Sequence, residues 1–107
     1  MTDVSLEDII TELVVNGGNA KSKAIQAIKA AKKGEFEVAE KRIKEANESL
    51  QQAHQFQTEL IQAEARGEEG ATISLIMIHG QDHLMNAMTT RDLAIEMIEM
   101  YKIIHPK

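Results

Sequence analysis

Hydrophobic residues recur at spacings of three and four along three long stretches of the chain, which is the period of one face of an α-helix. The helices predicted from this pattern span about residues 5–33, 35–65 and 72–104. The chain's one proline, at position 106, lies beyond all three. At 107 residues the sequence is long enough for one small domain. We therefore expect an all-α fold in which residues 1–107 form a single domain.

The first two predicted helices have recognisable ends. Ser5, followed three positions later by Asp8, is typical of a helix N-terminus. Lys32 and Lys33 precede Gly34, which is typical of a helix C-terminus because cations suit the negative end of the helix dipole and glycine can adopt a left-handed conformation. A second turn is expected over residues 66–70, with the sequence RGEEG.

Two adjacent glycines, Gly17 and Gly18, lie inside the first predicted helix. Each glycine costs about 1 kcal/mol relative to alanine in a helix interior, so one interpretation is a break into two short helices. Gly17, however, lies on the apolar stripe, where a missing side chain would let another helix come close. We therefore favour one continuous helix.

The third predicted helix is apolar on more than one side. Its first stripe is sufficient for packing on the other two helices and comprises Ile73, Ile76, Met77, Gly80, Leu84, Ala87, Met88, Ala94, Ile95 and Ile98. A second seam comprises Leu75, Ile78, Asp82, Met85, Thr89, Leu93 and Glu96. Three helices of this length cannot bury both faces within one chain. The second seam therefore predicts self-association through the third helix.

Charge and composition exclude several classes of function. The net charge is −5, acids and bases are interspersed, and there are three aromatic residues, so we expect no nucleic-acid binding. The longest uncharged run, residues 70–81, is too short for a membrane span, and the acidic start of the chain is unlike a secretory signal. Without cysteine there is no disulfide, thiolate zinc site or cysteine nucleophile. The expectation is a soluble cytoplasmic domain.

Candidate chemistry is concentrated in the third helix, in the sequence SLIMIHGQDHLMNAM, where His79, Gln81, Asp82 and His83 lie within five residues. Asp82 falls in the middle of the second seam, where a carboxylate is costly unless it is paired or bound to a metal. If this helix packs around a symmetry axis, several copies of Asp82 converge there. Converging carboxylates require protonation or a hard cation such as Mg²⁺.

The two histidines allow three interpretations. His79 lies about 60° around the helix from Asp82, and His83 stacks one turn above His79. Both could be hydrogen-bonded structural residues. The spacing could also place both on one zinc ion, although zinc sites normally have at least three protein ligands. In the third interpretation an imidazole is a nucleophile for a transferable group, since neutral histidine is a good nitrogen nucleophile. His54, His105 and the six methionines are interpreted as structural.

The same segment resembles the signature of the lactose/cellobiose-type enzyme IIA proteins of the bacterial phosphoenolpyruvate-dependent sugar phosphotransferase system. Two further stretches carry the resemblance over nearly the whole chain. Residues 16–40, NGGNAKSKAIQAIKAAKKGEFEVAE, are similar to the family's first helix and its turn into the second. Residues 53–68, AHQFQTELIQAEARGE, are similar to the end of its second helix.

The resemblance implies an antiparallel three-helix bundle that assembles into a homotrimer through its last helix. It implies that His79 is the phosphohistidine nucleophile, which receives a phosphoryl group from the phosphocarrier protein HPr. The group then passes to a cysteine of the cognate enzyme IIB and to a β-linked disaccharide (cellobiose, chitobiose or lactose) entering through membrane enzyme IIC. Asp82 corresponds to the family's metal-binding residue at the trimer axis, usually with Mg²⁺.

Two supporting residues and one alternative complete the expectations. Gln81 and His83 match the motif, and we expect both to lie near His79 as phosphate-contacting groups. The alternative function is a non-enzymatic helical trimer or a metal-binding module that uses His79 and His83 as ligands.

Overall fold

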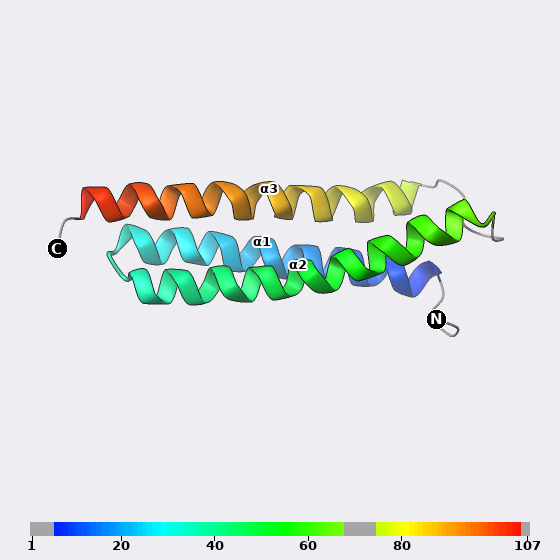
Figure 1. The fold of residues 1–107 in the computed structure, drawn as a ribbon, viewed down its shortest axis with the longest axis horizontal. Helices are drawn as coiled ribbons and strands as arrows, with labels where there is room; N and C mark the ends of the chain where they lie inside the picture. The colour runs from blue at the N-terminus through cyan, green and yellow to red at the C-terminus, as the bar shows by residue number, and fades with distance from the viewer. Residues whose placement is uncertain (1–5, 68–74, 106–107) are drawn as a thin grey trace.

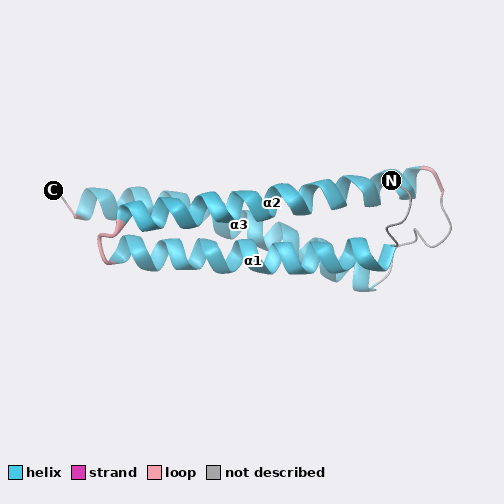
Figure 2. Cartoon of the chain, turned by 90° about the horizontal axis from the view of Figure 1, so that it is seen from below, coloured by secondary structure: helices cyan, strands magenta, loops and turns pink. Residues whose placement is uncertain are grey.

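The computed structural model describes residues 6–67 and 75–105, which form three long α-helices: α1 (Leu6–Lys32), α2 (Phe36–Ala65) and α3 (Leu75–Ile104). The helices run alternately in opposite directions, so α1 and α3 are parallel and α2 is antiparallel to both (Figure 1). The bundle measures 57 × 22 × 17 Å. Within the described residues all regular structure is helical (Figure 2), which confirms the prediction of an antiparallel all-α bundle.

The connection between α1 and α2 confirms the predicted helix end. Gly34 has a φ of +82°, in the left-handed region where only glycine is free of strain. Its N–H donates to the carbonyl of Ala31 over 2.9 Å, and the N–H of Glu35 donates to the carbonyl of Ala30 over 2.9 Å. These two bonds form a Schellman motif, which pairs carbonyls left unpaired at the end of α1. The two helices therefore form a tight hairpin.

Three sequence expectations fall wholly or partly outside the described residues. These are the start of the first helix at Ser5, the start of the third at residue 72, and residues 68–70 of the second turn. The described part of that turn ends α2 as expected, since Gly67 has a φ of +70°. The N–H of Arg66 there donates to the carbonyl of Gln62 over 3.0 Å.

Helix α1 is continuous through its two glycines, as the apolar stripe predicted. Gly17 is buried against α3, and a Cβ atom there would lie 3.1 Å from both the carbonyl carbon and the carbonyl oxygen of His83. Gly18 is exposed, and no described atom lies within 4 Å of the position that its Cβ would take. Gly17 thus permits a close approach of α1 to α3, whereas Gly18 is not required by packing.

Alanines dominate the contact between the helices. Those on α1 and α2 with no exposed surface are Ala20, Ala24, Ala27, Ala31, Ala39, Ala46 and Ala53. Small side chains allow helices to approach closely, and α1 packs along both α2 and α3, whereas α2 and α3 contact each other least. Larger residues, Ile9, Leu13 and Leu84, fill the core at the end of the bundle near the start of α1.

The second seam of α3 remains on the surface of the single chain. Ile78, Met85 and Leu93 are each more than half exposed, and Leu75 is 84% exposed. The exposed apolar strip also extends beyond the predicted seam, through Met97, Met100, Ile103 and Ile104. One chain therefore leaves a long apolar strip of α3 without a partner, which is the condition on which the prediction of self-association rests.

Candidate functional site

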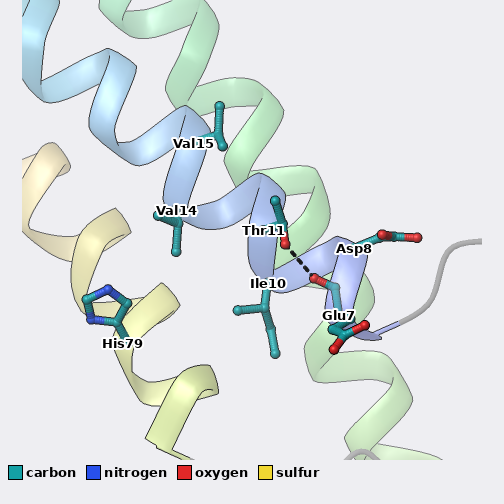
Figure 3. A pocket seen from close by; sticks show the side chains of 7 residues that line it. All are labelled: Glu7, Asp8, Ile10, Thr11, Val14, Val15 and His79. Atoms are coloured by element: carbon teal, nitrogen blue, oxygen red, sulfur yellow. Dashed lines mark hydrogen bonds between the residues drawn. The ribbon is translucent and has the colours of Figure 1, made fainter.

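His79 stands on the second turn of α3, exposed to solvent, and faces the first turns of α1. It lines an open pocket whose other residues all come from α1: Glu7, Asp8, Ile10, Thr11, Val14 and Val15. Figure 3 shows Ile10 and Val14 projecting from α1 toward α3, with His79 across the pocket from them. The Thr11 hydroxyl donates to the Glu7 carbonyl oxygen over 2.9 Å, within α1 itself. We refer to this feature as the His79 pocket.

Two glycines bring α1 and α3 together beside this pocket. A Cβ at Gly80 would lie 3.3 Å from the Cγ2 atom of Ile10, and Gly17 lies under the backbone of His83 and Leu84. Each helix therefore presents a glycine to the other at this level. His79 directly precedes Gly80, so the close approach of the two helices holds the backbone of His79 beside α1.

The imidazoles of His79 and His83 are in contact, as their four-residue spacing predicted. Their ring centroids lie 4.5 Å apart with an angle of 82° between the ring planes, which is an edge-to-face arrangement. His83 is half-buried and His79 is exposed. The more enclosed ring therefore restricts the orientation of the more accessible one.

Gln81 lies on another side of α3. Its Oε1 accepts a hydrogen bond of 2.8 Å from the Nε2 of Gln57 on α2. Residues two apart on an α-helix point about 200° from each other, which is why His79 faces α1 while Gln81 faces α2. Within one chain Gln81 thus has its partner on α2, and its expected role as a phosphate-contacting group near His79 stays a prediction. The motif places the two residues close in sequence and on opposite sides of the helix.

Asp82 is exposed in the second seam, with exposed Ile78 and Met85 one turn away on either side. In the part of the chain that the structure describes, no three histidine or acidic side chains gather as metal ligands. A single chain thus offers one Asp82 carboxylate at this point. A zinc ion held by His79 and His83 would likewise need at least one further ligand from beyond the described residues of this chain.

The other two histidines lie away from this site. His54 on α2 borders a shallow groove between α2 and α3, together with Asn47, Leu50, Gln51, Leu84, Met88 and Arg91. His105 packs its ring near Phe36 and Tyr101, at centroid distances of 6.0 and 6.3 Å, and so joins the end of α3 to the start of α2. The structural interpretation of His105 agrees with this packing.

Sequence reasoning missed the α1 side of the His79 pocket and the bond from Gln57. From sequence alone, Asp8 is interpreted only as part of the helix start with Ser5, and Glu7, Val14 and Val15 are assigned no role. Gln57 lies on a largely polar stretch of α2 and carries no signal of its own. These residues acquire a role only when a second helix is placed against them.

Comparison with known proteins decides the family. The sequence model described as "PTS system, Lactose/Cellobiose specific IIA subunit" matches residues 8–102. The chain belongs to this family. It is therefore an enzyme IIA component of a phosphotransferase system. None of the helices in residues 6–67 and 75–105 is both long and apolar enough to cross a membrane.

Relatives within the family carry several different sugar names. The chain is 52% identical over 99 residues to the lichenan-specific phosphotransferase enzyme IIA component of Bacillus subtilis, covering 92% of this chain and 89% of that one. It is 48% identical over 90 residues to the cellobiose-specific IIA component of Lactococcus lactis, covering 84% and 77%.

Solved structures share the fold over almost the whole chain. The cellobiose-specific enzyme IIA of Bacillus anthracis has a TM-score of 0.88 at 48% identity, covering 97% of this chain and 93% of that one. The chitobiose IIA of Escherichia coli, solved in complex with HPr, has a TM-score of 0.80 at 37% identity, covering 94% and 96%. The IIA family fold thus accounts for all three helices.

Proposed function

We propose that this IIA protein is a cytoplasmic phosphocarrier, in which His79 accepts a phosphoryl group from HPr and passes it to the cysteine of a cognate enzyme IIB. The observation that carries the proposal is the exposed imidazole of His79 at the edge of an open pocket, in a chain of this family. A phosphoryl carrier needs a nucleophile that two different partners can reach in turn. The open side of the His79 pocket supplies that access.

The transfer requires few groups on this chain. The lone pair of a ring nitrogen of His79 attacks phosphorus, the bond to the donor breaks, and the donor leaves with its electron pair. In the second step a thiolate of enzyme IIB attacks, and the phosphorus–nitrogen bond breaks in turn. Catalysis of this kind comes mainly from positioning and charge stabilisation. The ring of His83, in edge-to-face contact with that of His79, would serve the positioning by limiting rotation of the His79 imidazole.

Assembly as a homotrimer through α3 is the second part of the proposal. The exposed apolar strip of α3, including Leu75, Ile78 and Leu93, supports it because such a surface is unfavourable in water. In a threefold arrangement around this strip, one Asp82 from each subunit would converge on the axis. Carboxylate oxygens are ligands that Mg²⁺ prefers, so the three Asp82 side chains would hold the ion there. The ion would neutralise the converging charges.

The proposed final acceptor of the phosphoryl group is a β-linked disaccharide such as cellobiose, chitobiose or lactose, taken up through membrane enzyme IIC. Relatives at 40–52% identity carry lichenan, lactose, cellobiose, galactose and chitobiose in their names. Such closely similar carriers serving different sugars fit a component that hands on phosphate without contacting the sugar. The choice of sugar would then belong to the partner proteins.

The phosphocarrier proposal is tested by incubating the protein with phosphoenolpyruvate, enzyme I and HPr and measuring its intact mass. The expected result is one added phosphoryl group per chain, lost in His79→Ala and retained in His54→Ala. His54 is a suitable control because it is also exposed but borders a different groove. Retention of the phosphoryl group by His79→Ala would overturn the assignment. An unchanged mass together with stoichiometric zinc would favour the metal-binding alternative.

A further inference from the structure

The hydrogen bond between Gln57 and Gln81 ties α2 to the HGQDH segment of α3. Both side chains are part-buried at the bond, and Gln81 is half-buried as a residue. A primary amide has one acceptor oxygen and two N–H donors, and the two ends have nearly the same shape. A neighbour that donates to the oxygen therefore determines which end of the amide faces outward.

In this structure the Gln81 amide is oriented by a hydrogen bond from Gln57. The Nε2 of Gln57 donates to the Oε1 of Gln81 over 2.8 Å, so the acceptor end of Gln81 points to α2. The two N–H groups of Gln81 are then directed away from that bond. Donors of this kind stabilise anionic oxygens when they are held in place before the reaction.

Threefold packing would bring these donors to a histidine of another chain. Taking Asp82 as the direction of the axis, His79 points about 60° to one side and Gln81 about 100° to the other. In a cyclic trimer each interface joins unlike surfaces, so one flank of α3 meets the opposite flank of the next α3. His79 of one subunit would then face the Gln81 side of its neighbour. This step rests on the proposed function and its trimer.

We propose that Gln57 is a positioning residue for phosphoryl transfer, which holds the Gln81 amide with its N–H groups toward the phosphoryl group on the neighbouring subunit's His79. Gln57 does not touch the phosphoryl group. Its contribution is that the N–H groups of Gln81 already face outward before the phosphoryl group is transferred to His79. The orientation is lost if residue 57 accepts a hydrogen bond from Gln81 instead of donating one to it.

The experiment compares variants that differ only in hydrogen-bonding direction at residue 57. In Gln57→Glu the carboxylate accepts from Gln81 and turns its amide over, which presents Oε1 to the phosphoryl oxygens. We expect the rate of phosphoryl uptake from phospho-HPr to fall about tenfold, the size of one lost hydrogen bond to a charged group. Gln57→Lys can only donate, so residue 57 still donates to Oε1 of Gln81 and the amide keeps its orientation. Its rate should stay within about twofold of the parent.

A double-mutant cycle separates positioning from a general structural role. In a Gln81→Met background the amide is absent, so Gln57→Glu should cause no further fall in rate. An equal fall in both backgrounds would overturn the proposal, and so would a parental rate for Gln57→Glu. Circular dichroism and light scattering on each variant check that helices and assembly are unchanged.

Mixed trimers test whether the donor comes from the neighbouring chain. His79→Ala and Gln81→Met chains are unfolded and refolded together in equal amounts, so that about half of the intact His79 residues face an intact Gln81. The fast uptake phase should return for that fraction. If Gln81 acted within its own chain, mixing would restore nothing, which would refute the inference. Loss of phosphorylation in the parent protein itself would instead contradict the proposed function.

Discussion

Gly17 and Gly18 provide a sharp test of the packing between α1 and α3, because one faces α3 and the other faces solvent. The change is Gly→Ala at each position separately. Both substitutions remove a glycine from the interior of the same helix, so their effects on helix propensity are matched. Only Gly17→Ala adds an atom between two helices.

The expected free energies follow from the positions of the added methyl groups. Gly18→Ala should raise the free energy of unfolding by about 1 kcal/mol, the usual difference between alanine and glycine in a helix. At Gly17 the same gain is opposed by a Cβ placed 3.1 Å from backbone atoms of His83, which cannot rotate away. Overpacking of this kind costs about 1–3 kcal/mol. Gly17→Ala should therefore be less stable than Gly18→Ala by about 1–3 kcal/mol.

Urea unfolding followed by circular dichroism measures this difference. All proteins must be compared at one concentration, since self-association makes apparent stability depend on concentration. A midpoint shift in thermal unfolding of about 4 °C per kcal/mol gives an independent check for a domain of this size. Equal stability of the two variants would refute the argument, because it would mean that α1 and α3 can separate at Gly17 without cost.

Three further outcomes follow from the structure. In the proposed trimer, Asp82→Leu should keep or strengthen the assembly in light scattering while abolishing the proposed Mg²⁺ binding in calorimetry, and a monomeric variant would show that an ion holds the subunits together. Gly80→Ala should change the free energy of unfolding by less than about 1 kcal/mol, since its neighbour at 3.3 Å is a movable methyl of Ile10; a larger loss would contradict this. Arg42→Ala should raise the pKa of Glu45, measured by NMR titration, because the hydrogen bond from Arg42 is the main cause that lowers this pKa. The stabilisation of the fold by this bond is present above the unfolded-state pKa of Glu45 and is lost as pH falls. An unchanged pKa of Glu45 in the variant would contradict this.

The elements of the fold were predictable because each one is encoded locally. Spacings of three and four mark the buried face of each helix, and the Lys-Lys-Gly sequence marks the end of α1. The continuity of α1 through Gly17 was also predictable, since a glycine on an apolar stripe implies a close neighbour. The exposure of the second seam was also predictable, because α1 and α2 can cover only one of the two apolar faces of α3.

The His79 pocket was less predictable, since it joins helices that are distant in sequence. The motif indicated His79, and its ring contact with His83 follows from the helical period. Nothing within α1 indicated that Glu7 or Val14 would face that ring. The orientation of Gln81 could not be predicted because its partner, Gln57, lies 24 residues earlier on another helix. Side-chain direction between helices depends on their rotation, which a single helix's pattern does not define.

The up-down-up order of the helices has a consequence for synthesis of the protein on the ribosome. The α1–α2 hairpin is closed by local contacts around Gly34 and can form as soon as residues 6–65 have emerged. The His79 pocket, however, lies between the first turns of α1, which are synthesised early, and α3, which is synthesised last. A nascent chain thus acquires its scaffold early and the imidazole of His79 last. That imidazole reaches its place beside α1 only after the scaffold that positions it has been made.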